Sequence, residues 1–351
     1  MLAITLLLLV ARPCFAADAI SEGQWYHQFL KTAEAHRLTQ GAGVTVAVLD
    51  TGVDASHPDL AGSILPGTDL TAAQGDGRTD LHGHGTGMAG LIAAHGRVQG
   101  IAPAAKILPV RVAVVDDGRS FRFAVGVRWA VAQGARVISI SFGGGGDDIL
   151  ERQEIEAAIA ADVVVVAGVG NRPRDSSVIF PASTAGVVAV GAVDKSGETA
   201  DLSVRGQEVV IAAPGVGISG AFPGNKYNVT SGTSDATAIV AGAVALVRAK
   251  FPQLKAPEVI RRLTATAIDK GSPGRDPDYG FGVLNLVGAL TADVPAAASP
   301  SPVKASSAVG APPPSTSDRF PWWLLVVAVP VIVIAVIVVV VWSRRRGQIG
   351  Q

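Results

Sequence analysis

The sequence predicts an α/β protein whose central sheet is mostly parallel and is covered by helices on both faces. Two observations support this fold class. Several short apolar runs lack the alternation of apolar and polar residues that a half-exposed strand shows, which is typical of strands buried on both faces. Helical patterns separate these runs, and a strand, helix, strand order implies a parallel sheet with helices packed on it.

Apolar runs mark the expected strands, and amphipathic stretches mark two of the expected helices. The strands are VTVAVL (44–49), RVISIS (136–141), VVVVAG (163–168), GVVAVGAV (186–193) and EVVIAA (208–213). The helices are FAVGVRWAVAQ (123–133) and EIEAAIAA (154–161). In such sheets, ligands and reactive groups gather beyond the carboxyl ends of the strands. Side chains that directly follow a strand are therefore the first candidates for function.

An aspartate, a histidine and a serine each stand at the end of an expected element. Asp50 closes the first strand in LDTGVDASHPDL. His84 lies between glycines in DLHGHGTGMAGLIAA and leads into an apolar helical run. Ser234 lies in TSGTSDATAIVAGAVALV, again at the start of a helical run. If the three face the same edge of the sheet, they can assemble a catalytic triad.

Each of these residue types has a defined task in acyl transfer. A serine hydroxyl is a weak nucleophile until a neighbouring base removes its proton. His84 can accept that proton and later deliver it to the leaving amine. A buried Asp50 would hold the imidazole in the required tautomer and stabilise its charged form. At a helix N-terminus, Ser234 can also offer its backbone N–H to the oxyanion that forms.

These stretches resemble the subtilisin-like serine peptidases. The matching motifs are AVLDTGVDASHPDL for the acid, HGHGTGMAG for the base and SGTSDATA for the nucleophile, and they follow the family's chain order. The resemblance runs from about Gln40 to Asn285. It implies a subtilisin-like fold and a serine endopeptidase that acts on protein or peptide substrates.

Three further stretches carry the same resemblance. ISISFGG resembles the family's substrate-binding strand and implies that Ser141, Phe142 and Gly143 bind substrate. VVVVAGVGN resembles the segment that ends in the oxyanion asparagine, which falls on Asn171. FPASTAGVVAVGAV resembles the family's stretch beyond it. Loss of one oxyanion donor typically lowers turnover by about 10²–10³-fold.

Two positions near the serine depart from the family pattern. Asp235 stands where the family usually has an apolar residue, and Ala238 stands where it usually has proline. We favour Asp235 as a first-turn charge that interacts with the helix dipole. The alternative is that its carboxylate raises the basicity of His84. Neither departure removes a catalytic group.

Charge and motif spacing exclude several other classes of function. The chain of 351 residues has 29 basic and 29 acidic side chains, which gives no reason to expect a nucleic-acid partner. Asp80, His82 and His84 lack the fixed spacing of a zinc motif, so no metal is expected. The glycine run at 143–146 has no P-loop lysine after it, and no cofactor is expected.

The N-terminal segment is typical of a signal peptide, predicted over residues 1–17. An apolar core runs from Leu2 to Val10, and small residues at Ala16 and Ala17 offer a cleavage site. The alternatives are a buried N-terminal strand or a misplaced start codon. The only cysteine, Cys14, lies in this segment, so the mature chain is expected to have no disulfide.

The C-terminal segment is typical of a single membrane span. Residues 322–342 are almost wholly apolar, long enough to cross a bilayer, and flanked by tryptophans. SRRR follows, which predicts a cytoplasmic tail at 343–351 and a peptidase domain, residues 18–292, on the extracytoplasmic side of the cell membrane. Residues 293–321 are rich in Pro, Ala and Ser and predict a linker. A buried soluble helix is the alternative for the apolar segment.

A short N-terminal extension, a linker, one span and an arginine tail resemble the mycosins, which are membrane-anchored subtilisin-like proteases of type VII secretion systems. Mycosins often carry disulfides, which this chain cannot form. The resemblance implies cleavage of secreted proteins at the outer membrane face, with type VII components as partners. The alternative is a membrane-tethered scaffold that stabilises a secretion complex and does not need proteolysis.

Overall fold

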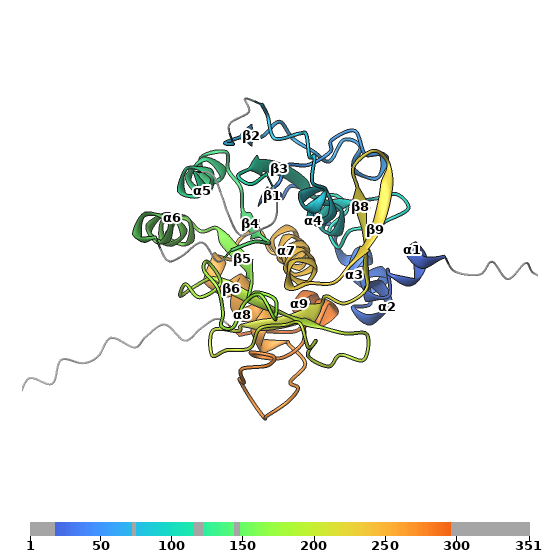
Figure 1. The fold of residues 1–351 in the computed structure, drawn as a ribbon. Helices are drawn as coiled ribbons and strands as arrows, with labels where there is room; N and C mark the ends of the chain where they lie inside the picture. The colour runs from blue at the N-terminus through green and yellow to red at the C-terminus, as the bar shows by residue number, and fades with distance from the viewer. Residues whose placement is uncertain (1–17, 72–74, 115–121, 144–147, 296–351) are drawn as a thin grey trace, which may run out of the picture. The chain divides into compact units, whose positions relative to one another are not determined.

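A seven-stranded sheet forms the centre of the protein, with the strand order β2-β3-β1-β4-β5-β6-β7 and parallel pairing throughout (Figure 1). The structure is a computed structural model that describes residues 18–71, 75–114, 122–143 and 148–295. These residues belong to one unit of the chain, residues 1–297; a second unit, residues 298–351, lies outside the described residues. The strands are β1 (Thr45–Asp50), β2 (Thr68–Asp69), β3 (Lys106–Arg111), β4 (Val137–Ile140), β5 (Val164–Gly168), β6 (Val188–Val193) and β7 (Ile211–Pro214).

The five predicted strands correspond to β1 and to β4 through β7, with ends that differ by at most three residues. The predicted α/β fold with its parallel sheet is confirmed. β3 is not among the predicted strands, although it pairs with β1 along its whole length. Its central Pro109 has no N–H to donate, which is unusual inside a sheet. It is accommodated here because the neighbour on the other side, β2, has only two residues.

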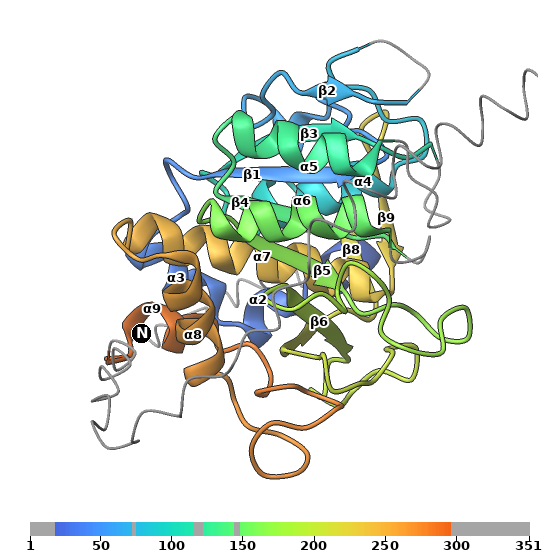
Figure 2. The same ribbon diagram turned by 90° about the vertical axis from the view of Figure 1, so that its left-hand side faces the viewer.

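Helices cover both faces of the sheet, and the side chains of β1 show why. Val46 and Val48 belong to the apolar cluster on one face, whereas Ala47 and Leu49 belong to the cluster on the other. α4 (His84–Ala93) and α7 (Thr233–Lys250) pack on the first face. α5 (Phe123–Ala132) and α6 (Ile149–Ala160) pack on the second and lie in front of the sheet in Figure 2.

An antiparallel hairpin lies beside α4, outside the main sheet (Figure 1). It consists of β8 (Ile218–Phe222) and β9 (Lys226–Thr230). The remaining helices are short or peripheral: α1 (Ala19–Glu22), α2 (Tyr26–Phe29), α3 (Thr32–Leu38), the 3₁₀ turn η1 (Pro58–Leu60), α8 (Ala256–Ala265) and α9 (Leu286–Thr291). The first three form the N-terminal extension.

Asp162, just before β5, joins three elements. Its carboxylate accepts hydrogen bonds from Arg248 of α7, from Arg136 before β4, and from the backbone N–H of Ala256 at the start of α8. The side chain of Arg248 is 1% exposed, so its charge depends on this acid for compensation. Asp162 also has a φ of 67°, a left-handed conformation that asparagine tolerates as well as aspartate does.

We expect Asp162→Asn to lower the free energy of unfolding by about 2–3 kcal/mol, because it leaves the buried guanidinium of Arg248 without a counter-charge. Urea unfolding followed by circular dichroism measures the change. Asp201→Asn, at an exposed position, is the matched control and should change stability by under about 0.5 kcal/mol. Equal stabilities for the two variants would contradict the assigned role of Asp162.

Both predicted membrane-related segments lie outside the described residues. These are the signal peptide, residues 1–17, and the span, residues 322–342, together with the tail and nearly all of the linker. Among the helices that the structure describes, none combines the length and the apolar character that a bilayer crossing requires.

Candidate active site

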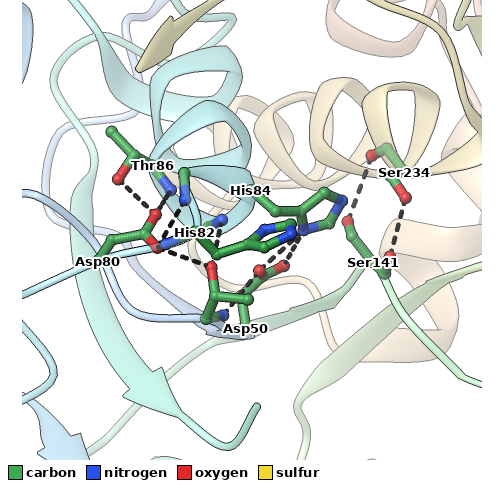
Figure 3. A network of polar contacts seen from close by, with 10 residues as sticks. Asp50, Asp80, His82, His84, Thr86, Ser141 and Ser234 are labelled. Atoms are coloured by element: carbon green, nitrogen blue, oxygen red, sulfur yellow. Dashed lines mark hydrogen bonds and ion pairs between the residues drawn. The ribbon is translucent and has the colours of Figure 1, made fainter. Parts of the chain in front are cut away.

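Asp50 and His84 are in direct contact. Nδ1 of His84 lies 2.8 Å from Oδ1 and 3.0 Å from Oδ2 of Asp50 (Figure 3). Asp50 is the last residue of β1 and is 1% exposed, whereas His84 is the first residue of α4. A buried carboxylate at this distance requires a hydrogen on Nδ1, so Nε2 is the ring nitrogen that can accept a proton.

Two glycines allow this contact. Gly52 has a φ of 101°, which lets the chain turn sharply after Asp50. Gly85 follows His84, and a β-carbon there would collide with the carbonyl oxygen of Gly52. The first turn of α4 can therefore approach the end of β1 closely only because both positions lack a side chain.

Asp80 holds the loop that carries His84. Its Oδ1 accepts hydrogen bonds from the hydroxyl of Thr51 and the N–H groups of His82 and Gly83, and its Oδ2 accepts two from Thr86 (Figure 3). The side chain of Asp80 is 4% exposed, and both of its carboxylate oxygens accept these hydrogen bonds. From the sequence, Asp80 was a candidate for a metal site only, and this positioning role was missed. The signal was its place four residues before the candidate base, in a loop rich in glycine.

Ser234 lies in the first turn of α7, next to the carboxyl end of β4. Its hydroxyl donates a hydrogen bond of 2.8 Å to the carbonyl oxygen of Ser141. In return, the hydroxyl of Ser141 donates to the carbonyl oxygen of Ser234 at 3.2 Å (Figure 3). The structure therefore brings Ser234 to the same sheet edge as Asp50 and His84, with its hydroxyl directed at Ser141.

Asn171 follows β5 and reaches the N-terminus of α7. Its Oδ1 accepts a hydrogen bond of 2.9 Å from the backbone N–H of Thr233. This bond fixes the amide orientation, because only the oxygen can accept it. The NH₂ group of Asn171 is thus available as a donor in the pocket that Asn171 lines together with His84 and Ser234.

The predicted substrate-binding residues Ser141, Phe142 and Gly143 directly follow β4. The ring of Phe142 is buried and packs edge-on against Phe123, with the centroids 6.0 Å apart. A side chain at Gly143 would collide with the carbonyl oxygen of Phe180. The packing of Phe142 and Gly143 thus fixes this segment against the core of the domain, and its backbone groups are the part that can bind a substrate.

Asp235 follows the serine and is 2% exposed. Its Oδ1 accepts a hydrogen bond of 2.7 Å from the hydroxyl of Thr230 in β9. Burial raises the pKa of Asp235 to about 6, outweighing the Thr230 hydrogen bond and the charge of His84, which both lower it. Asp235 does lie in the first turn of α7, as predicted. Ala238 is simply buried in the middle of the helix.

We expect Asn171→Ala to lower kcat by about 10²–10³-fold with little change in KM, because the lost amide donor would stabilise charge that develops only in the transition state. Steady-state kinetics on a peptide substrate measures both constants. A loss smaller than tenfold, or one confined to KM, would exclude Asn171 as an oxyanion donor.

The chain resembles known peptidases over most of its length. The sequence profile of the subtilase family matches residues 41–282. Subtilisin DY of Bacillus licheniformis is 36% identical over 254 residues, which cover 70% of this chain and 90% of that protein. A thermostable alkaline protease of Halalkalibacterium halodurans is 37% identical over 266 residues, covering 74% of this chain and 72% of the protease.

Solved structures show the same likeness in three dimensions. The crystal structure of MycP1 with its N-terminal propeptide removed superimposes with a TM-score of 0.69 at 29% identity, covering 77% of this chain and 98% of that one. Fervidolysin from Fervidobacterium pennivorans, a keratinolytic enzyme related to subtilisin, gives a TM-score of 0.71 at 29% identity. That match covers 82% of this chain and 49% of fervidolysin.

Proposed function

The chain belongs to the subtilase family and is a serine endopeptidase, and from that premise we propose that Asp50, His84 and Ser234 carry out its reaction. The observation that carries this assignment is the 2.8 Å contact between His84 and the buried Asp50, at the pocket that also holds Ser234 and Asn171. The substrate is a protein or peptide.

Acylation begins when the proton of Ser234 is redirected from the Ser141 carbonyl to Nε2 of His84. The serine oxygen then bonds to the carbonyl carbon of the substrate, and the carbonyl oxygen takes the negative charge. The backbone N–H of Ser234 and the amide of Asn171 donate to this oxyanion. Collapse breaks the C–N bond, and His84 gives its proton to the leaving amine. Water then gives a proton to His84 and attacks the carbonyl carbon of the acyl-enzyme. The ester bond breaks, the acid product leaves, and His84 returns the proton to the oxygen of Ser234.

A fluorophosphonate probe tests the nucleophile directly. The phosphorus bonds to the serine oxygen, fluoride leaves, and the serine proton passes to His84. We expect the full-length chain to gain one covalent adduct, located on Ser234 by mass spectrometry, and Ser234→Ala to gain none. A folded chain that forms no adduct, or forms it elsewhere, would contradict this assignment.

We further propose that the enzyme is anchored in the cell membrane with its peptidase domain outside and its tail in the cytoplasm. The support is sequence-based: the apolar segment at 322–342, the arginines that follow, and the N-terminal segment typical of a signal peptide. The similarity to MycP1 adds the mycosin-like role, cleavage of proteins in a type VII secretion system.

Protease protection tests the topology. In intact spheroplasts, added proteinase should digest the peptidase domain and leave a C-terminal epitope tag protected inside the cell. Release of the chain into the soluble fraction by alkaline carbonate would contradict the anchor. Unchanged protein termini in the secretome of a Ser234→Ala strain would contradict cleavage of secreted proteins.

A further inference from the structure

A pocket of about 150 Å³ opens beside the candidate nucleophile. His84, Asn171 and Ser234 line it, together with Asp235 of α7 and Asn228 and Thr230 of β9. The residues that follow β4, Ser141 to Gly143, are not part of its lining, although Ser141 is in hydrogen-bond contact with Ser234.

This arrangement places the pocket on one side of the scissile bond. We infer that the segment after β4, which contacts Ser234 through Ser141 but does not line the pocket, binds the acyl part of the substrate. The pocket instead adjoins His84, the group that protonates the leaving amine. It therefore lies where the residue after the scissile bond must sit.

Two glycines from distant parts of the chain create its space. Gly87 of α4 and Gly220 of β8 both line the pocket. A β-carbon built on Gly220 would stand 3.6 Å from the α-carbon of Gly87, so the two backbones face each other. Larger side chains at these positions would fill the space that is now open.

The chemistry of the lining is acidic and rich in oxygen. Asp235 contributes a buried carboxylate, whose Oδ1 accepts a hydrogen bond from the hydroxyl of Thr230. No lysine or arginine is found among the described residues that line the pocket. Two titratable groups interact with Asp235. The charge of His84 lowers the pKa of the Asp235 carboxyl. The pKa of Tyr26 in α2 is raised mainly by burial and further by the charge of Asp235.

We propose that Asp235 is a specificity-determining residue that makes this pocket select a cationic side chain, lysine foremost, directly after the scissile bond. The inference rests on the proposed peptidase function. The ammonium group would donate hydrogen bonds to the carboxylate and to the oxygens of Asn228 and Thr230. Met88 and the two glycines would contact the methylene stem of the lysine.

The charge of Asp235 is present at alkaline pH. Burial raises the pKa of the carboxyl to about 6, so it is mostly ionised at pH 8 and mostly protonated at pH 5. A carboxylate shielded from water interacts with a cation more strongly than an exposed one, since solvent screening is reduced.

Capture of the acyl-enzyme by amines isolates this pocket from the rest of the site. An activated ester acylates Ser234, and an amino-acid amide then competes with water for the acyl group. The amine nitrogen bonds to the acyl carbon, its proton passes to His84, and the serine oxygen leaves and takes that proton. The side chain of the captured amide occupies the position after the new peptide bond.

At pH 8, we expect lysine amide to capture the acyl-enzyme of the full-length chain about 10–100 times more efficiently than methionine amide, which is similar in length but uncharged. In Asp235→Asn, the ratio should fall to within about twofold, because a neutral amide replaces the charge at constant shape. Rate changes common to both amides cancel in this ratio. Glu156→Gln, at an exposed position on α6, is the matched control for loss of one acid and should keep the native ratio.

A second variant tests the space rather than the charge. Gly87→Leu should lower capture of both amides relative to glycine amide, since the leucine side chain enters the pocket. The proposal is overturned if the native enzyme captures the two amides equally, or if Asp235→Asn keeps the lysine preference. Ester turnover without lysine preference refutes only this inference, whereas absence of ester turnover refutes the peptidase assignment itself.

Discussion

Replacing Ser234 with alanine is expected to lower kcat for peptide hydrolysis by roughly 10⁶-fold. Alanine removes the oxygen that bonds to the substrate carbonyl, so the acyl-enzyme cannot form and His84 has no proton to accept. The backbone N–H and Asn171 remain, and the residual rate over water reflects their action alone. Burst-phase and steady-state kinetics on an internally quenched peptide measure the loss.

The matched control is Ser196→Ala. Ser196 lies in an exposed turn after β6, where its hydroxyl donates to Asp194. Its removal should leave kcat within about twofold, as is usual for surface substitutions away from a site. Retention of more than about a thousandth of the native rate in Ser234→Ala would show that another group attacks the substrate.

Asp50→Asn should lower kcat by about 10⁴-fold while leaving the fold intact. Asparagine has the same shape, but its NH₂ group can face Nδ1 of His84, which then must act as the acceptor. The hydrogen moves to Nε2, and that nitrogen can no longer take the serine proton. The 1% exposure of Asp50 leaves no room for water to restore the native tautomer.

Steady-state kinetics of Asp50→Asn should be compared with those of Asp54→Asn. Asp54 lies in the loop that follows Asp50, where it accepts hydrogen bonds from Ser56 and from the N–H of Gly224. Its neutralisation should change kcat less than about tenfold, because it acts only on loop geometry. Similar losses in the two variants would show that Asp50 serves the loop rather than the imidazole.

The sequence was sufficient to predict the parallel sheet and the convergence of Asp50, His84 and Ser234. Each of the five predicted strands is a continuous apolar run, and each candidate residue lies at an element end, so the rule for carboxyl ends of parallel strands brings them together. Asn171 was identified differently, through the resemblance of VVVVAGVGN to a segment of the subtilisin-like peptidases, and the structure has it after β5, hydrogen-bonded to the N-terminus of α7.

Other features depend on contacts between distant residues and could not be predicted in this way. β3 contains Pro109, which argues against a strand unless the two-residue length of its neighbour is known. The pocket arises where Gly87 of α4 faces Gly220 of β8, and neither local pattern indicates the other. The raised pKa of Asp235 likewise follows from burial, which a first-turn position does not reveal.

α4 and α7 share one face of the sheet, and the base lies at the start of one helix and the nucleophile at the start of the other. The distance over which a proton must pass from Ser234 to His84 therefore depends on the spacing of these two helices. A small residue of α7 contributes to this spacing: a methyl group added at Gly242 would press against Ile101, whose N–H donates a hydrogen bond to the carbonyl oxygen of Leu91 in α4. Interior volume far from the chemistry therefore tunes the reaction rate, since an ångström of displacement at reacting atoms costs about a hundredfold.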